Sequence, residues 1–399
     1  MRITSIETLW LNEFSNVLWV LIHTDEGVTG LGETFFGSKA VEAFIHETAA
    51  LKLIGEDPLR IEHLNRELLT YVGFSGQGVE ERGRSAIDIA LWDLFGKVVN
   101  QPVYQLLGGL CRDKVRTYNT CAGYKYVRSR PTWGTDDWGL EQKSEGPYED
   151  LDSFLNNADE LAHSLLEQGI TGMKIWPFDT AAEKTKGYDI SSADLNAALV
   201  PFEKIRKAVG DKMDIHVELH SLWRLPGILK VVKALEPFDP YWIEDPIRMD
   251  GFDDLRTLSE RTSAPICASE TLGTIRDFRS LMEAQCAHIV MPDVGWCGGI
   301  TETKKIAAIA EAYQRPVAPH DCQGPVVLAA SVHMSLALPN VLVQESVRAF
   351  YDGWYGELVD TVPRPVNGFF LPPEGPGLGL NLLPELWTRD DANRKVTDA

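Results

Sequence analysis

Short runs of hydrophobic residues alternate with helical stretches along the chain from about residue 115 onward. Several of these runs are almost continuously apolar, which is typical of strands covered on both faces. We expect eight strands, at residues 115–120, 172–176, 214–219, 241–244, 266–270, 288–293, 316–320 and 341–345. Helical stretches such as residues 251–262 lie between them. This alternation favours right-handed βα units that close into a barrel, with an open doubly wound sheet as the alternative.

The N-terminal part of the chain follows a different pattern. Residues 16–24 and 28–33 are expected to pair as two strands around an Asp-Glu-Gly turn. Apolar positions in residues 84–99 recur at helical spacing, so this segment is predicted to bury one face of a helix. Strands followed by helices predict a separate α+β domain, which we place at residues 1–122.

A long segment without periodicity follows at residues 123–150, which are rich in aromatic residues, Gly and Pro. Loops of this length are uncommon in compact domains, and they act as lids, form oligomer contacts or stay disordered. We therefore predict an aromatic loop insertion at the beginning of a barrel domain that spans residues 123–350.

Composition narrows the class of protein. The 399 residues are 44% hydrophobic and 24% charged, as in ordinary globular proteins. The formal net charge of −20 gives no support to binding of nucleic acid or of an anionic membrane, since both need basic patches. The six cysteines form no C-x-x-C pair, and the chain has neither a signal-peptide pattern nor a long apolar run. These features predict a cytoplasmic protein with free thiols.

The last six expected strands share one feature, an ionisable residue at or near the carboxyl end. These residues are Glu218, Glu244, Glu270, Asp293, His320 and Glu345. They are spaced 23 to 27 residues apart, about the length of one βα unit. Barrel active sites are built at the carboxyl ends of the strands, so we expect the six side chains to converge on one mouth.

The residue types at these positions indicate metal-assisted proton transfer. Glu218, Glu244 and Glu270 would offer three carboxylate oxygens, which suit a hard ion such as Mg²⁺. The alternative is that each glutamate caps a helix or pairs with a surface cation. His320 is a candidate base whose ring Asp293 would orient, and His220 lies two residues beyond a candidate metal ligand.

Several segments carry a family resemblance. In chain order they are SAIDIALWDLFGKVVNQPVYQLLGG, WIEDP, ASET, PDVGWCGGIT, APHD and PEGPGLGLNL. Together they resemble the mandelate racemase subgroup of the enolase superfamily, over essentially the whole chain. The resemblance implies an α/β fold, a modified (β/α)7β TIM barrel with an N-terminal α+β capping domain to which residues 351–399 return. It also implies Mg²⁺ on the three glutamates, a His320/Asp293 dyad and, by analogy, a homo-oligomer.

The reaction common to this subgroup begins with removal of the proton α to a carboxylate. In its racemases the second expected barrel strand carries K-x-K, and the second lysine works opposite the histidine. Here that strand has Lys174, Ile175 and Trp176. Because Trp176 cannot transfer a proton, a Lys/His racemase is disfavoured. Lys174 either binds the substrate or neutralises nearby carboxylates.

The Glu-x-His pattern of Glu218 and His220 resembles the family's sugar-acid dehydratases. This resemblance implies that His220 protonates the departing 3-hydroxyl and that Glu345 hydrogen-bonds the substrate carboxylate or the developing ene-diolate. The leading hypothesis is a Mg²⁺-dependent dehydratase that converts a monocarboxylate sugar acid, an aldonate, into a 2-keto-3-deoxy acid. No arginine is marked by pattern as a clamp for a second carboxylate, which favours a mono-acid over a diacid.

Family loops over the barrel mouth match residues 11–16 and 71–78, which makes Phe14 and Tyr71, with Trp176 and Lys174, candidates for substrate contact. Packing or subunit contact is the alternative for these residues. A sugar-acid epimerase or a lactone cycloisomerase would use the same metal and histidines. A non-catalytic binding barrel is disfavoured because all five metal-binding and dyad residues are present.

Overall fold

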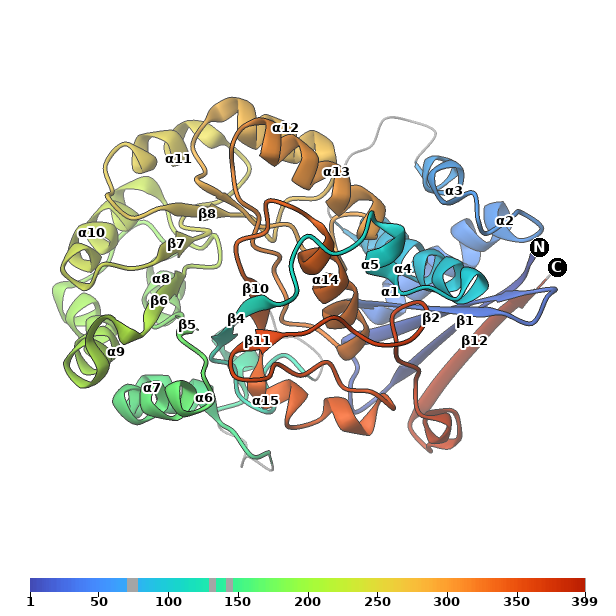
Figure 1. The fold of residues 1–399 in the computed structure, drawn as a ribbon. Helices are drawn as coiled ribbons and strands as arrows, with labels where there is room; N and C mark the ends of the chain where they lie inside the picture. Colours follow the sequence, from blue (N-terminus) through green and yellow to red (C-terminus); the bar gives the residue numbers. More distant parts are fainter. Residues whose placement is uncertain (70–77, 129–133, 141–145, 399) are drawn as a thin grey trace.

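The computed structural model describes residues 1–69, 78–128, 134–140 and 146–398. Its strands form two sheets. A parallel sheet with the strand order β10-β4-β5-β6-β7-β8-β9 curls at one side of the molecule. An antiparallel sheet with the order β12-β1-β2-β3 lies at the other side, covered by helices (Figure 1). This arrangement confirms the predicted modified barrel with a capping domain.

The parallel strands are short and follow the expected positions closely. They are β4 (Val115–Thr120), β5 (Gly172–Ile175), β6 (Asp214–Glu218), β7 (Trp242–Glu244), β8 (Ile266–Ala268), β9 (Ile289–Val290) and β10 (Gln344–Ser346). One expected strand, at 316–320, forms isolated parallel bridges instead. Val317 bridges Val290 on one side and Val341 on the other, so this segment continues the curve of the sheet toward β10.

Successive side chains of β6 point to opposite faces, which explains the polar residues inside the barrel. Ile215 and Val217 belong to the large core. His216 lies on the other face, where its ring centroid is 4.4 Å from that of Tyr118 and 4.0 Å from that of Trp242. His216 is therefore a structural residue, and the aromatic packing around it fills the barrel interior.

Helices form an outer arc around the parallel strands (Figure 1). The helices of this part of the chain are α6 (Asp150–Asn156), α7 (Ala158–Glu167), α8 (Asp179–Thr185), α9 (Ser192–Val209), α10 (Leu225–Leu235), α11 (Phe252–Ser259), α12 (Ile275–Ala284), α13 (Gly299–Ala312), α14 (Pro325–Ala337) and α15 (Arg348–Tyr351). A short strand, β11 (Phe369–Phe370), pairs antiparallel with β4. Within the described residues, no helix has the length and apolarity needed to cross a membrane.

The capping domain combines the expected hairpin with the expected helix. Its elements are β1 (Ile3–Leu11), β2 (Val17–Thr24), β3 (Thr29–Phe35), β12 (Ala392–Asp398), α1 (Ser38–Phe44), α2 (Ala50–Leu53), α3 (Ile61–Glu67), α4 (Val79–Val99) and α5 (Val103–Leu106). Helix α4 lies directly on β3, because a Cβ atom added at Gly32 would come 1.9 Å from the carbonyl oxygen of Ala86. Only glycine allows so close an approach.

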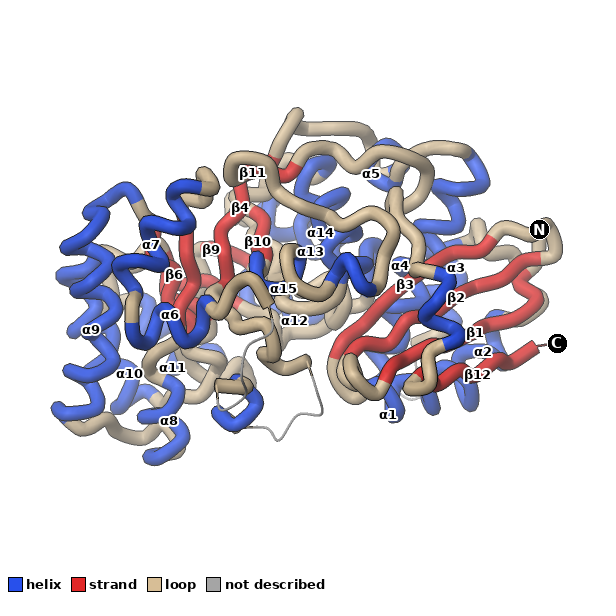
Figure 2. Tube along the Cα trace, turned by 90° about the horizontal axis from the view of Figure 1, so that it is seen from below, coloured by secondary structure: helices blue, strands red, loops and turns tan. Residues whose placement is uncertain are grey.

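The C-terminal segment returns to the capping sheet, where β12 pairs antiparallel with β1 (Figure 2). The two termini therefore lie at the same end of the molecule. Strand β4 already belongs to the parallel sheet, although it precedes residue 122. The division of the chain at residues 122 and 350 stays a prediction.

Buried carboxylates join the capping domain to the barrel helices. Glu33 on β3 accepts hydrogen bonds from Trp19 Nε1 at 2.7 Å and from the backbone N–H of Val327 in α14 at 3.0 Å. Asp88 on α4 accepts bonds from the backbone N–H and the hydroxyl of Thr301 in α13, at 2.9 and 2.6 Å. These contacts place the cap at the amino ends of two barrel helices, where anionic groups are favoured.

The variant Glu33→Gln is expected to gain stability relative to the unchanged chain as the pH rises from about 5 to about 8. Burial raises the pKa of Glu33 from 4.5 to about 7, so its ionised form destabilises the folded state. Below pH 4.5, Glu33 is protonated in both the folded and the unfolded state, and the folded state pays no cost for it. As the pH rises from 4.5 to about 7, the unfolded state ionises first, so the unchanged chain loses stability that Glu33→Gln keeps. The full effect on the free energy of unfolding is about 3 kcal/mol.

Urea unfolding of both proteins across this pH range measures the difference directly. Glu260→Gln is the matched control, because Glu260 is exposed at the end of α11 and water solvates its charge in both states. A difference between Glu33→Gln and the unchanged chain that does not vary with pH would contradict the prediction.

Candidate active site

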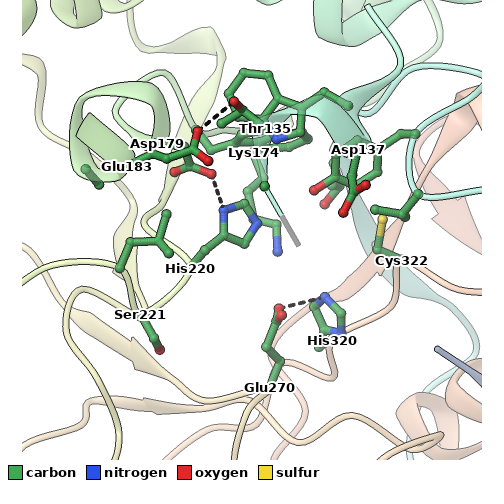
Figure 3. Close-up of a pocket in the computed structure, with 18 of the residues that line it drawn as sticks. Thr135, Asp137, Lys174, Asp179, Glu183, His220, Ser221, Glu270, His320 and Cys322 are labelled. Atoms are coloured by element: carbon green, nitrogen blue, oxygen red, sulfur yellow. Dashed lines mark hydrogen bonds and ion pairs between the residues drawn. The ribbon is translucent and has the colours of Figure 1, made fainter. Parts of the chain in front are cut away.

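A cavity of about 550 Å³ lies at the carboxyl ends of the barrel strands (Figure 3). Its inner wall includes Lys174, His220, Glu270 and His320. Aromatic side chains form much of the remaining wall, namely Phe36, Tyr126, Trp138, Trp176 and Trp296. Phe36 comes from the capping domain, and Tyr126 and Trp138 come from the predicted aromatic loop. The wall of the cavity is therefore polar at the strand ends and aromatic over much of the rest.

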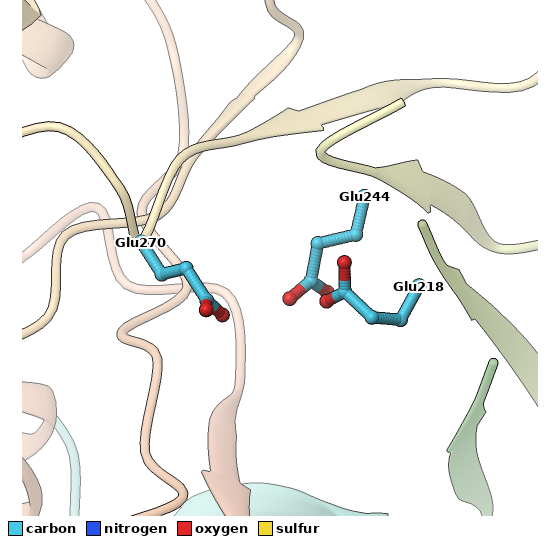
Figure 4. Close-up of side chains that lie close together, drawn as sticks. All are labelled: Glu218, Glu244 and Glu270. Atoms are coloured by element: carbon cyan, nitrogen blue, oxygen red, sulfur yellow. The ribbon is translucent and has the colours of Figure 1, made fainter. Parts of the chain in front are cut away.

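Two buried glutamates, Glu218 and Glu244, and the partly buried Glu270 meet in this region (Figure 4). Glu218 and Glu244 are directly paired in the register of β6 and β7, and Glu270 follows β8 by two residues. One oxygen from each of the three lies within 4.8 Å of the others. The parallel register explains the cluster, because neighbouring strand ends turn the same face toward the barrel axis.

The charge of this triad fits a divalent metal ion. Burial and the neighbouring Glu218 raise the pKa of Glu244 well above its ordinary value. Glu218 Oε2 accepts no hydrogen bond within the described residues, and it lies 3.4 Å from Lys174 Nζ. Carboxylate oxygens are the ligands that hard divalent ions prefer. A cation at the triad would thus relieve a repulsion that the chain alone leaves in place.

Lys174 neutralises carboxylates at this site, which is one of its two expected roles. Its Nζ lies 2.6 Å from Glu244 Oε1 and 2.8 Å from Glu345 Oε1, and the side chain is only 2% exposed. Glu345 also accepts hydrogen bonds from the Thr120 hydroxyl and from the backbone N–H of Asp321. Because these donors engage both oxygens of Glu345, its contact with a substrate stays a proposal.

His320 and Asp293 form the expected pair. The two residues are partners in an isolated parallel bridge, and His320 Nδ1 lies 2.6 Å from Asp293 Oδ2. Gln323 Nε2 donates to both oxygens of Asp293, and the backbone N–H of Gly295 donates to Oδ1 at 2.7 Å. His320 Nε2 lies 2.8 Å from Glu270 Oε2. The carboxylate holds one ring nitrogen, so the other faces the triad.

Carboxylates around both histidines oppose the effect of burial on their pKa values. Burial alone would lower the pKa of His320, but Glu270, Glu345 and Asp293 raise it well above its ordinary value. Burial would likewise lower the pKa of His220, but Asp179 and Glu218 raise it to about 10.

Asp179 is a site residue that the sequence pattern does not reveal. Its Oδ2 lies 2.7 Å from His220 Nδ1, so His220 has a carboxylate partner as His320 does (Figure 3). Asp179 begins α8, three residues beyond Trp176 and outside the regular spacing of strand ends. Only the position of α8 in space brings it to the cavity.

The remaining candidates for substrate contact are Trp176, Phe14 and Tyr71. Trp176 lines the cavity. Phe14 is not among the residues that line it, and its buried ring packs 5.2 Å from that of Trp354. Tyr71 lies outside the described residues. Arg224 and Arg248 also line the cavity, so the lack of an arginine marked by pattern is no argument for a mono-acid.

Comparison with known proteins places both parts of the chain in one family. Residues 7–108 match the family described as mandelate racemase / muconate lactonizing enzyme, N-terminal domain, and residues 157–386 match the enolase C-terminal domain-like family. The chain belongs to the mandelate racemase/muconate lactonizing enzyme family. The expected resemblance is confirmed.

Individual relatives agree with this assignment. A D-galactonate dehydratase from Ralstonia pickettii (strain 12J) is 33% identical over 393 residues, which cover 96% of this chain and 92% of the relative. A mandelate racemase subgroup enolase from Agrobacterium tumefaciens is 52% identical with a TM-score of 0.89, covering 100% of this chain and 99% of that one. An enolase protein from Sargasso Sea environmental sequencing is 40% identical with a TM-score of 0.88, over 100% and 99% of the two chains.

The family relationship identifies the chain as an enzyme, as expected. Enolase superfamily members typically bind a divalent metal ion, and the triad offers ligands for one. Which ion the site takes belongs to the proposal below.

The variant Glu218→Gln is expected to bind a divalent cation at least ~10²-fold more weakly than the unchanged chain, since even residues that only support metal ligands are worth 10- to 100-fold in affinity. Isothermal titration with Mg²⁺ and with Mn²⁺ measures the loss. Glu183→Gln is the control, because Glu183 lines the outer cavity and accepts a hydrogen bond from the Thr135 hydroxyl at 2.8 Å. Equal affinity in Glu218→Gln and the unchanged chain would exclude the triad as the metal site.

Proposed function

We propose that the chain is a Mg²⁺-dependent dehydratase of a monocarboxylate sugar acid, a hydro-lyase that yields a 2-keto-3-deoxy acid. The observation that carries the proposal is the pairing of each of two cavity histidines with its own aspartate, beside a triad of carboxylates. The relative named D-galactonate dehydratase supports this reaction and a mono-acid substrate.

Glu218, Glu244 and Glu270 would hold the ion in this proposal. Bound there, Mg²⁺ would neutralise the substrate carboxylate and the negative charge that develops when the α-proton leaves. Lys174 keeps the surrounding carboxylates from repelling one another, and Glu345 would contact the substrate carboxylate or the developing ene-diolate.

His320 would act as the base. In the neutral form of His320, Nε2 takes the proton from C2 of the substrate, while Asp293 accepts the hydrogen bond from Nδ1 and keeps the ring from rotating. Gln323 and the backbone of Gly295 hold the Asp293 carboxylate in turn. The chain thus positions the base through successive buried hydrogen bonds.

His220 would act as the acid. The electron pair of the C2–H bond first moves toward the carboxylate and gives the ene-diolate. It then forms a C2–C3 double bond as the C3–O bond breaks, and His220 Nε2 supplies the proton with which the hydroxyl leaves as water. Asp179 stabilises the charged form of His220 at Nδ1. The enol that results takes up a proton at C3 and becomes the 2-keto-3-deoxy acid.

Epimerisation at C2 is the second candidate. Two carboxylate-paired histidines on different strand ends would also suit removal of a proton by one and its return by the other. Cycloisomerisation of a sugar-acid lactone would begin with the same proton transfer. Product analysis separates these reactions, because they share their residues.

Purified protein with Mg²⁺ in D₂O is expected to convert one or a few aldonates to 2-keto acids, and EDTA should abolish the reaction. The screen includes aldarates and uronates, and it measures keto-acid formation together with α-deuterium uptake. Deuterium uptake without keto-acid formation would show that the enzyme is not a dehydratase and would assign it as an epimerase or a cycloisomerase. Turnover of aldarates alone would contradict the mono-acid proposal and would favour a second carboxylate at Arg224, which lines the outer cavity.

The variant His320→Asn is expected to lose both α-proton exchange and dehydration, because it removes the base. His220→Asn should retain exchange but dehydrate ~10²- to 10⁴-fold more slowly, since one well-placed acid contributes that much. Exchange is followed by NMR in D₂O, and circular dichroism checks that both variants are folded. Retained exchange in His320→Asn would overturn the assignment of the base.

A further inference from the structure

Two polar atoms in the cavity wall have no partner among the described residues. Trp176 is 1% exposed, and its indole Nε1 finds no acceptor. Asp179 is 3% exposed, and its Oδ1 finds no donor, although Oδ2 is bonded to His220. Both residues line the cavity, and Figure 3 shows Asp179 beside His220 at its edge.

Leaving such atoms unpaired is costly. A buried donor or acceptor without a partner destabilises a protein by roughly 1–3 kcal/mol, and most buried polar atoms in native structures are paired. Trp296, another tryptophan of the same wall, does have a partner, because its Nε1 donates to the carbonyl oxygen of Phe35 at 3.1 Å. The unpaired state of Trp176 is thus not a general property of this aromatic wall.

Neither group can turn away to find a partner elsewhere. The Trp176 ring packs against Phe154 and Tyr126, with ring centroids 5.2 and 5.4 Å away. Asp179 is fixed by its bond to His220. The donor is on Trp176, directly after β5, and the acceptor is on Asp179, the first residue of α8. One fixed donor and one fixed acceptor complement a hydroxyl group, which accepts one hydrogen bond and donates another.

We propose that Trp176 Nε1 and Asp179 Oδ1 form a subsite for one hydroxyl group of the sugar-acid chain beyond the reacting carbons. This inference rests on the proposed function and deepens it. Asp179 contacts the ring nitrogen of His220 that faces away from the departing C3 hydroxyl, so the bound hydroxyl is the one at C4 or C5. The subsite selects polyhydroxylated acids over shorter or deoxygenated ones.

A substrate that lacks this hydroxyl leaves both buried atoms unpaired again. Sites built to bind a substrate hydroxyl reject analogues without it by large factors, up to about 10⁵-fold. For the unchanged chain we expect kcat/KM to fall at least ~10²-fold for either the 4-deoxy or the 5-deoxy analogue of the preferred sugar acid, and much less for the other.

Trp176→Phe tests the donor, because phenylalanine keeps an aromatic ring in the wall and removes the N–H. The ratio of kcat/KM for the parent acid to that for the sensitive analogue should fall at least ~10-fold in this variant. Trp223→Phe is the matched control: the Trp223 Nε1 is also buried without a partner, but the residue does not line the cavity. Its ratio should equal that of the unchanged chain.

The outcomes separate this inference from the function on which it rests. Equal turnover of the parent and both deoxy analogues by the unchanged chain overturns the subsite and leaves the dehydratase intact. The same fall of the ratio in Trp223→Phe as in Trp176→Phe also overturns it. Failure of every sugar acid to react removes the proposed function, and the subsite with it. The deoxy series on the unchanged chain decides the matter even when Trp176→Phe does not fold.

Discussion

Three carboxylates held within 4.8 Å of one another inside a barrel are the constraint on which the rest of the site depends. Like charges this close repel strongly in a buried environment, and the repulsion adds to the cost of removing them from water. The chain offsets part of this cost with side chains from other strand ends, since Lys174 contacts Glu244 and His320 contacts Glu270. The negative charge that remains is what suits the site to a divalent ion.

The part of this site that obeys the barrel repeat could be predicted from the sequence. One βα unit brings each strand end back to the same rim after about 25 residues, so regularly spaced ionisable residues identify neighbours in space. The pairing of Glu218 with Glu244, and the bridge between Asp293 and His320, are direct results of parallel register. The capping hairpin and helix α4 were also predicted, from a turn pattern and from apolar residues at helical spacing, although α4 is buried on more than the one face expected.

Residues outside that repeat could not be predicted. Asp179 and Gln323 lie beyond strand ends, where loop geometry decides which side chains return to the cavity. Phe14 lies in a segment that matches a family loop, yet packing against Trp354 buries it away from the cavity. The expected strand at 316–320 forms only bridges, because short contacts with Val290 and Val341 suffice to continue the sheet. Tertiary packing determines the structure in each of these cases, and it cannot be predicted from the local sequence pattern.

The residues proposed to support proton transfer and substrate recognition lie close together in the chain, directly after β5. At the position of the second lysine of K-x-K, this chain has Trp176, which can donate a hydrogen bond but cannot transfer a proton. Three residues later, Asp179 supports His220 on the neighbouring strand. The second proton-transfer group of the proposed reaction is therefore supported from the start of α8, which follows β5, but is not located on β5. Because the triad and the His320 dyad suit any reaction that begins at C2, the segment from Trp176 to Asp179 argues only against a racemase with a lysine on β5 as its second base, and dehydration and epimerisation through His220 remain to be separated by their products.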